Sequence, residues 1–279
     1  MAKPIRMGSG FRVVQSRTWF PTIALFVIPL IVQAQELDDD HDHGHLHFSH
    51  PLVTESPSPD TKIRLDYIAT NISAGPGLHE NTIRVEGEYS FTHSVSLAWV
   101  TPFTFRTAPS NESTSGFGDM ELSLKAASLA FGARGILFGG GLSVGIPTGS
   151  DVKEIGSSHI VEVEPFVDAA YKYDALELVG FARLSSAIHR RPGEDEERNL
   201  AFDFSVLYRL HPRVEGLIEL TTERSLIATD IRAPQTSIAP GLKLYPFANK
   251  QIMFGASLEL GTGAVHSRRT VLLSGFYHF

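Results

Sequence analysis

The chain has 279 residues, with 24 Lys and Arg against 31 Asp and Glu, which gives a formal net charge of −7. This acidic balance argues against nucleic acid as a partner. The chain contains no cysteine, which excludes disulfide bonds, thiolate catalysis and zinc sites built from cysteine.

Residues 1–34 have the parts of a secretory signal peptide. A basic start precedes an apolar run over residues 19–32, and Val32–Ala34 offers small residues for cleavage. The run is too short to span a membrane as a helix. Residues 1–34 carry four of the basic residues and none of the acidic ones, so the mature chain keeps 20 basic against 31 acidic residues, a net charge of −11.

A leader rich in histidine and aspartate follows, over residues 35–60. Five of the twelve histidines lie within ten residues, at His41, His43, His45, His47 and His50. Neutral imidazoles with nearby carboxylates could bind zinc, copper, nickel or cobalt, although the fold requires no cofactor. We predict that the leader is disordered, and the alternative to metal binding is that its solvated histidines have no specific ligand. Residues Ser56–Pro59 are predicted to form an extended linker. We expect the leader to lie in the periplasm.

From residue 61 to residue 279 the sequence alternates between apolar and polar residues in short segments separated by turn residues, the period of half-buried strands. Twelve strands are predicted, around residues 63–67, 83–91, 95–99, 120–126, 136–146, 161–173, 176–188, 200–208, 214–220, 238–244, 252–260 and 271–279. In the seventh, either Leu176, Leu178 and Leu184 or Val179 and Phe181 face outward, and the pattern leaves this open.

The connections and the aromatic residues indicate how these strands are arranged. Short and long connections alternate, as in an up-and-down membrane barrel with tight turns on the periplasmic side. Aromatic residues end the even-numbered strands, which predicts one interfacial girdle. Its members are Tyr89, Phe91, Tyr171, Tyr173, Tyr208, Tyr245, Phe247, Tyr277 and Phe279.

The last strand, Val271–Phe279, ends on an apolar face with an aromatic residue, as do the closing strands of outer-membrane proteins. We expect the barrel-assembly machinery to recognise it and outer-membrane lipid to surround the barrel. The predicted fold is therefore all-β: an up-and-down antiparallel transmembrane β-barrel of about 12 strands in the outer membrane of a Gram-negative bacterium. A soluble β-sandwich or lipocalin-like barrel is the alternative, but its charged strand faces would look outward.

In a membrane barrel the polar strand faces line the lumen. Such lining residues need partners or hydration, so the lumen is either a salt-bridged, largely closed interior or a narrow, acidic aqueous pore. The predicted lining residues are Arg84, Glu86, Glu88, Glu121, Lys125, Glu162, Glu164, Asp168, Asp203, Arg209, Glu215, Glu219, Lys243 and Glu259.

Residues 116–149 contain two motifs, Gly116-Phe117-Gly118-Asp119 before one strand and Pro147-Thr148-Gly149 after the next. In these motifs the chain resembles the outer-membrane family labelled MetA-pathway of phenol degradation proteins, or transporters. The resemblance implies passage of small molecules across the outer membrane. Physically, glycines, an aspartate and a proline in such positions shape loops at the outer rim, a simpler interpretation than a substrate site.

The predicted function is a conduit for small solutes, linked through the leader to transition-metal handling. One alternative is a sealed structural or adhesive barrel whose outer loops bind partners. Another is a lipid hydrolase, but no serine and histidine are placed to act together, and we predict no catalytic residue. The pairs considered are His47 with Ser49, His93 with Ser94, His159 with Ser157, and His266 with Ser267.

Overall fold

The computed structural model describes residues 47–73, 78–108, 110, 112–131, 135–189, 197–227, 230–231, 234–262 and 267–279. Within these ranges the strands are β1 (Lys62–Ser73), β2 (Leu78–Thr92), β3 (Val95–Thr107), β4 (Ser113–Phe117), β5 (Met120–Phe131), β6 (Ile136–Ile146), β7 (Val161–Tyr173), β8 (Leu176–His189), β9 (Glu197–His211), β10 (Val214–Ile227), β11 (Asp230–Ile231), β12 (Gln235–Leu244), β13 (Ile252–Thr262) and β14 (Ser267–His278).

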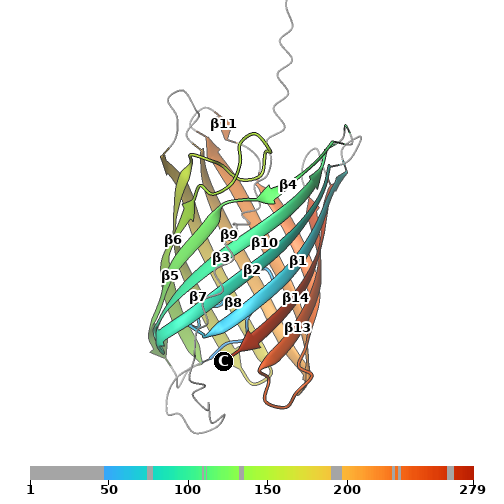
Figure 1. The fold of residues 1–279 in the computed structure, drawn as a ribbon. Coiled ribbons are helices and arrows are strands. Elements are labelled where there is room, and N and C mark those ends of the chain that lie inside the picture. Colours follow the sequence, from blue (N-terminus) through green and yellow to red (C-terminus); the bar gives the residue numbers. More distant parts are fainter. Residues whose placement is uncertain are drawn as a thin grey trace, which may run out of the picture.

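Twelve of these strands close into a single antiparallel barrel (Figure 1). Each pairs with its neighbours along the chain, and β14 closes the wall against β1 from Lys62–His278 to Ser73–Ser267. The short strands β4 and β11 only extend the hairpins of β3 and β10. The prediction of a twelve-strand up-and-down barrel is confirmed, and most strands continue beyond their predicted bounds. In the part of the chain that the structure describes, no helix is long and apolar enough to cross a membrane.

The two ends of the barrel differ. Short turns such as Asp174–Ala175 and Pro212–Arg213, together with the carboxyl terminus, lie at one end, which we call the turn end. The longer connections carrying β4 and β11 lie at the other, the loop end (Figure 1). At the turn end Gly135 has a φ of 65°, and a Cβ there would lie 2.2 Å from the carbonyl oxygen of Lys172, so this close turn favours glycine.

The barrel wall is inverted relative to a soluble protein. Apolar side chains such as Leu65 and Val167 point outward and are 54% and 64% exposed, whereas the Lys243 side chain, which points inward, is fully buried. Lipid is the solvent that accepts such an outer face. In β8, Leu184 faces outward whereas Val179 and Phe181 are buried in the lumen, which settles the orientation that the sequence left open.

Most of the predicted aromatic girdle lies on the outer face at the turn end. Phe91, Tyr173 and Phe247 are all more than half exposed there. Tyr245 is the exception, because its hydroxyl donates to the Glu215 carboxylate at 3.1 Å and its ring packs against the apolar core of the lumen. Its place in the girdle was predicted wrongly, because Tyr245 follows the outward-facing Leu244 and therefore turns inward, whereas Phe247 lies in the turn beyond the end of β12 and is exposed.

On the outer face the Trp99 ring lies against Gly87. A Cβ at Gly87 would come within 2.1 Å of this ring, so we expect Gly87→Ala to displace Trp99 and cost about 1–3 kcal/mol. In a chain starting after residue 34, Trp99 is the only tryptophan, and its emission reports the shift directly. The matched control is Gly275→Ala, whose Cβ meets only Phe254 at 3.7 Å. Unchanged emission and thermal midpoint in Gly87→Ala would contradict this packing.

Candidate functional site

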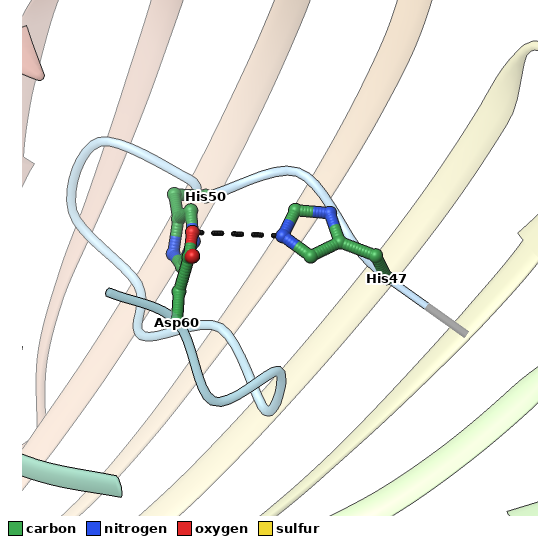
Figure 2. Close-up of side chains that lie close together, drawn as sticks. All are labelled: His47, His50 and Asp60. Atoms are coloured by element: carbon green, nitrogen blue, oxygen red, sulfur yellow. Dashed lines mark hydrogen bonds and ion pairs between the residues drawn. The ribbon is translucent and has the colours of Figure 1, made fainter. Parts of the chain in front are cut away.

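The lumen contains part of the chain itself. Residues 47–60, which we call the plug segment, lie inside the barrel before β1 begins, and Phe48 and Leu52 are completely buried there. Figure 2 shows the segment looping within the wall of strands. The prediction of a free, disordered leader is therefore wrong for these residues. Residues 35–46, including His41, His43 and His45, lie outside the described residues.

Lumen carboxylates bind the backbone amides of the plug segment. The carboxylate of Glu219 on β10 accepts hydrogen bonds from the N–H groups of Leu52, Val53 and Thr54, at 3.3, 2.9 and 2.9 Å. Glu177 on β8 accepts the N–H of Ser49 at 2.7 Å. The barrel strands use their own backbone groups in the wall, so only side chains can serve the plug.

Lumen cations bind the carbonyl groups of the same segment. Lys243 donates to the carbonyl of His50 at 3.0 Å, and Lys172 donates to that of His47 at 3.2 Å. Arg64 donates to the carbonyl of Leu52. Charged donors and acceptors make stronger hydrogen bonds than neutral ones. The lumen side chains therefore bind both the N–H groups and the carbonyl groups of the plug backbone strongly.

An apolar patch inside the barrel receives the plug side chains. Phe48 and Leu52 belong to a buried cluster that also contains lumen-facing residues of β8, β9, β10, β13 and β14. Leu52 packs directly on Gly255, where a Cβ would lie 2.3 Å from the Leu52 side chain. Burying each of these two side chains contributes about 1.5–3 kcal/mol, so the patch and the plug stabilise each other. The wall residues of the cluster include Val179, Leu207, Leu217, Met253 and Phe276.

An ion-pair network joins β1, β2 and β5 beneath the plug. Lys62 lies 2.9 Å from Glu88 and 3.3 Å from Glu86, and Lys125 lies 3.4 Å from Glu88. Arg64 adds a bond to Asp66 at 2.8 Å. The sequence interpretation missed these three β1 residues as lumen charges. Their signal was present, because they alternate with the predicted outward residues Ile63, Leu65 and Tyr67.

All fourteen predicted lining residues lie on inward-facing positions of their strands. Many pair with other lumen charges: Arg183 of β8, which the sequence interpretation also missed, lies 2.8 Å from Asp203 and 3.8 Å from Glu164. Arg209 differs from the others, because it lies beside the turn end and is exposed. Within the described residues the lumen therefore contains the salt bridges of the first predicted alternative, together with the plug segment.

Three ligand-type side chains meet where the plug segment begins and ends (Figure 2). One Asp60 oxygen lies 2.9 Å from Nε2 of His50 and 3.5 Å from Nε2 of His47. The same oxygen lies 2.7 Å from Nδ1 of His278, next to the carboxyl terminus. Of the predicted metal ligands, the structure therefore brings His47 and His50 together and adds Asp60.

Burial and histidine contacts set the ionisation of this cluster. Burial, reinforced by the nearby Lys62 ammonium, holds the pKa of His50 well below its usual value. Burial alone would raise the pKa of Asp60, but hydrogen bonds from His278, His47 and His50 outweigh it and lower that pKa. His50 is therefore a neutral imidazole beside a carboxylate at neutral pH.

At the loop end, Asp119 joins two loops. Its carboxylate accepts the N–H groups of Gly149 at 3.0 Å and Ser157 at 2.9 Å, and the Thr148 hydroxyl accepts the N–H of Met120 at 3.0 Å. A Cβ at Gly149 would lie 2.5 Å from a backbone oxygen, so glycine is required for this approach. Gly116, Gly118 and Pro147 flank the same contacts. This geometry is that of a rim brace rather than a binding pocket.

The serine–histidine pairs do not form a catalytic arrangement among the described residues. Ser49 donates its hydroxyl to Glu215 at 3.3 Å. At the rim, the same Nδ1 atom of His159 lies 3.0 Å from Asp151 and 3.5 Å from Ser157, whereas a relay needs one ring nitrogen for each partner. His266 lies outside the described residues.

Comparisons with solved structures show the fold. An outer-membrane channel from Pseudomonas putida F1 is similar over 80% of this chain and 97% of its own, with a TM-score of 0.61 and 15% identity. The NanC porin matches 77% of this chain and 100% of its own, with a TM-score of 0.55 and 11% identity. The translocator domain of the autotransporter NalP from Neisseria meningitidis covers 79% and 89%, with a TM-score of 0.53 and 10% identity. No family model and no curated protein matches the sequence.

The contacts of Glu219 predict that its loss frees the plug. Each hydrogen bond to a charged group contributes about 1.5–3 kcal/mol, so Glu219→Ala should raise the population of displaced plug at least tenfold. Because the chain has no cysteine, a single Ser56→Cys reporter, buried at 1% exposure, can be labelled with a soluble maleimide. Labelling should accelerate in Glu219→Ala but not in Glu259→Ala, which removes another lumen carboxylate. Equal rates would refute the role of Glu219.

The rim brace predicts local loosening without global unfolding. Asp119→Ala removes the acceptor for Gly149 and Ser157 and leaves the wall hydrogen bonds intact. We expect trypsin to cleave after the exposed Lys153 several times faster, while the barrel keeps its thermal midpoint. Glu112→Ala, in the neighbouring loop, serves as the control and should leave the cleavage rate unchanged.

Proposed function

We propose that the protein is an outer-membrane conduit for small solutes, obstructed in this structure by its own plug segment. The observation that carries this proposal is the polar and charged lumen of a twelve-strand wall, occupied by a segment that is tied to it by side chains alone. Side-chain contacts can be released without breaking the wall, whereas a lumen filled by a strand of the sheet could not open.

The lumen charges favour cations over anions. The acidic lining residues Glu164 and Asp203 both lie near the guanidinium of Arg183, and Glu121 interacts with the same group. Carboxylates lining a low-dielectric passage attract cations and repel anions. We therefore propose small cationic or neutral solutes as the cargo class of the conduit.

The same proposal places the barrel in the outer membrane of a Gram-negative bacterium with the turn end toward the periplasm. The resemblance of Gly116–Asp119 and Pro147–Gly149 to the family labelled MetA-pathway of phenol degradation proteins supports small-molecule passage. Assembly would start from recognition of the strand that ends at Phe279. Outer-membrane lipid would then contact the exposed apolar face.

The sealed structural barrel is the second candidate function, favoured by one specific observation. The plug segment pairs with lumen charges and packs against the apolar patch, so this part of the interior resembles a permanent core. The two candidates differ in whether removing the plug leaves a water-filled passage. A lipid hydrolase has no comparable support, because no described serine has a histidine and a carboxylate in relay geometry.

Conductance in planar bilayers tests the conduit. The mature chain should show small or infrequent openings, and a variant lacking residues 35–58 should show larger, steady openings with a reversal potential that indicates cation preference. Deletion of residues 35–46 alone is the control, since it leaves the plug segment in place, and should resemble the full mature chain. If the plugless variant folds, as judged by its heat-modifiable gel mobility, and yet passes no current, the sealed barrel is correct.

A further inference from the structure

The strongest unassigned feature of the lumen is the group of His47, His50 and Asp60. Their ligand atoms all lie within 4.8 Å of one another. His47 and His50 come from the start of the plug segment, and Asp60 comes from its end, two residues before β1 begins at Lys62. We propose that a divalent transition-metal ion, with zinc as the best fit, binds here and fastens the plug segment as a closed loop inside the barrel.

The donor set suits zinc. Two imidazole nitrogens and one carboxylate oxygen form a common three-ligand zinc set, with water in the fourth position. Zinc at about 2.0–2.1 Å from each donor places tetrahedral ligand atoms about 3.3 Å apart. The Asp60 oxygen already lies 2.9 Å from His50 and 3.5 Å from His47, so small side-chain rotations reach this geometry. His47 is the mobile partner, because its side chain is 61% exposed.

Lys62 defines the main cost of binding. Its ammonium donates to Nδ1 of His50 at 3.1 Å, so the ring proton lies on Nε2 and points at Asp60. A metal on Nε2 moves the ring proton to Nδ1, and Lys62 must then release His50. Lys62 keeps Glu88 at 2.9 Å and Glu86 at 3.3 Å, so its ammonium remains paired.

The carboxylate of Asp60 is the negative charge that would contact the dication directly. Glu86 and Glu88 lie next to the site, where they already pair with Lys62, Lys125 and Arg64. The tautomer change keeps the single ring proton of His50, now on Nδ1, so the ring can offer the Nε2 lone pair while remaining a neutral imidazole.

The position of the cluster gives the metal its effect. The Glu219 contacts at Leu52–Thr54 hold the middle of the plug segment, and the metal would hold both of its ends. A plug fastened at both ends must break a metal bond before it can leave the lumen. The metal thus acts as a lock, because it keeps the plug segment in the lumen. This inference rests on the proposed function only for the effect of the metal on conduction.

Calorimetry on the full mature chain in detergent tests the site itself, whether or not the lumen conducts. We expect one tight zinc site with a dissociation constant of about 1 µM or lower. Asp60→Asn and His47→Ala should each weaken it at least 100-fold, more than the loss of an outer-sphere partner costs. His47 is largely exposed, so its removal leaves the fold intact even if Asp60→Asn disturbs it.

Two further variants locate the site. His93→Ala removes an exposed histidine in the β2–β3 turn and should leave zinc affinity unchanged. A variant with His41, His43 and His45 all replaced by alanine should also keep the tight site. Loss of tight binding in that triple variant, with full binding retained in His47→Ala, would overturn the assignment and move the site into the leader.

Hydrogen exchange tests the lock separately. Zinc should slow exchange of the amides at Leu52–Thr54 at least tenfold in the unmodified chain and have no effect in His47→Ala. Zinc binding without slower exchange would overturn the lock. Slower exchange in a protein that never conducts, even without its plug, would leave the metal site intact and refute only the proposed conduit.

Discussion

Polar groups enclosed by the barrel must be paired, and this constraint accounts for the interior of the molecule. The wall satisfies its own backbone through strand pairing, but its inward side chains carry many charges away from bulk water. The plug segment brings a further stretch of unpaired amides and carbonyls into the same space. Each set supplies what the other lacks: Glu219 binds three plug amides, and Lys243 and Arg64 bind plug carbonyls. Charges that would be costly alone become the attachment points of the plug.

Strand periodicity carries nearly all the information that made the wall predictable. Alternation of period two gave each strand its lipid face, so Lys62 and Arg64 could have been assigned to the lumen from the outward positions of Ile63 and Leu65. Alternation does not define the lipid face of β8, because residues on both of its faces are apolar. The orientation of β8 depends on Phe48 and Leu52, because their packing makes an apolar inner face at Val179 favourable. Local pattern cannot report a partner that arrives from elsewhere in the chain.

The plug segment was unpredictable for the same reason. Its histidines, serines and prolines have the composition of a solvated leader, and only its contacts with the lumen order it. Several of those contacts join residues more than 120 positions apart, such as Ser49 with Glu177 and Leu52 with Glu219. The rim brace was easier, because Asp119 and Gly149 belong to neighbouring hairpins and their residue types have direct roles in loops. The rim brace could be predicted and the plug segment could not, and the difference lies in the sequence distance between contacting residues rather than in their burial.

Displacement of the plug would change the lumen in a specific way. Glu177 and Glu219 would lose the amides that they bind, and Lys243 and Lys172 would lose carbonyls, but each of these lysines keeps a carboxylate partner in Glu215 and Glu177. Glu219 has no such ion pair among the described contacts of the lumen, so opening leaves a carboxylate facing water in the passage. A cation entering the lumen would stabilise that carboxylate. Opening of the plug and cation selectivity are therefore coupled through one residue, because the group that holds the plug closed is also the group that an open passage presents to its cargo.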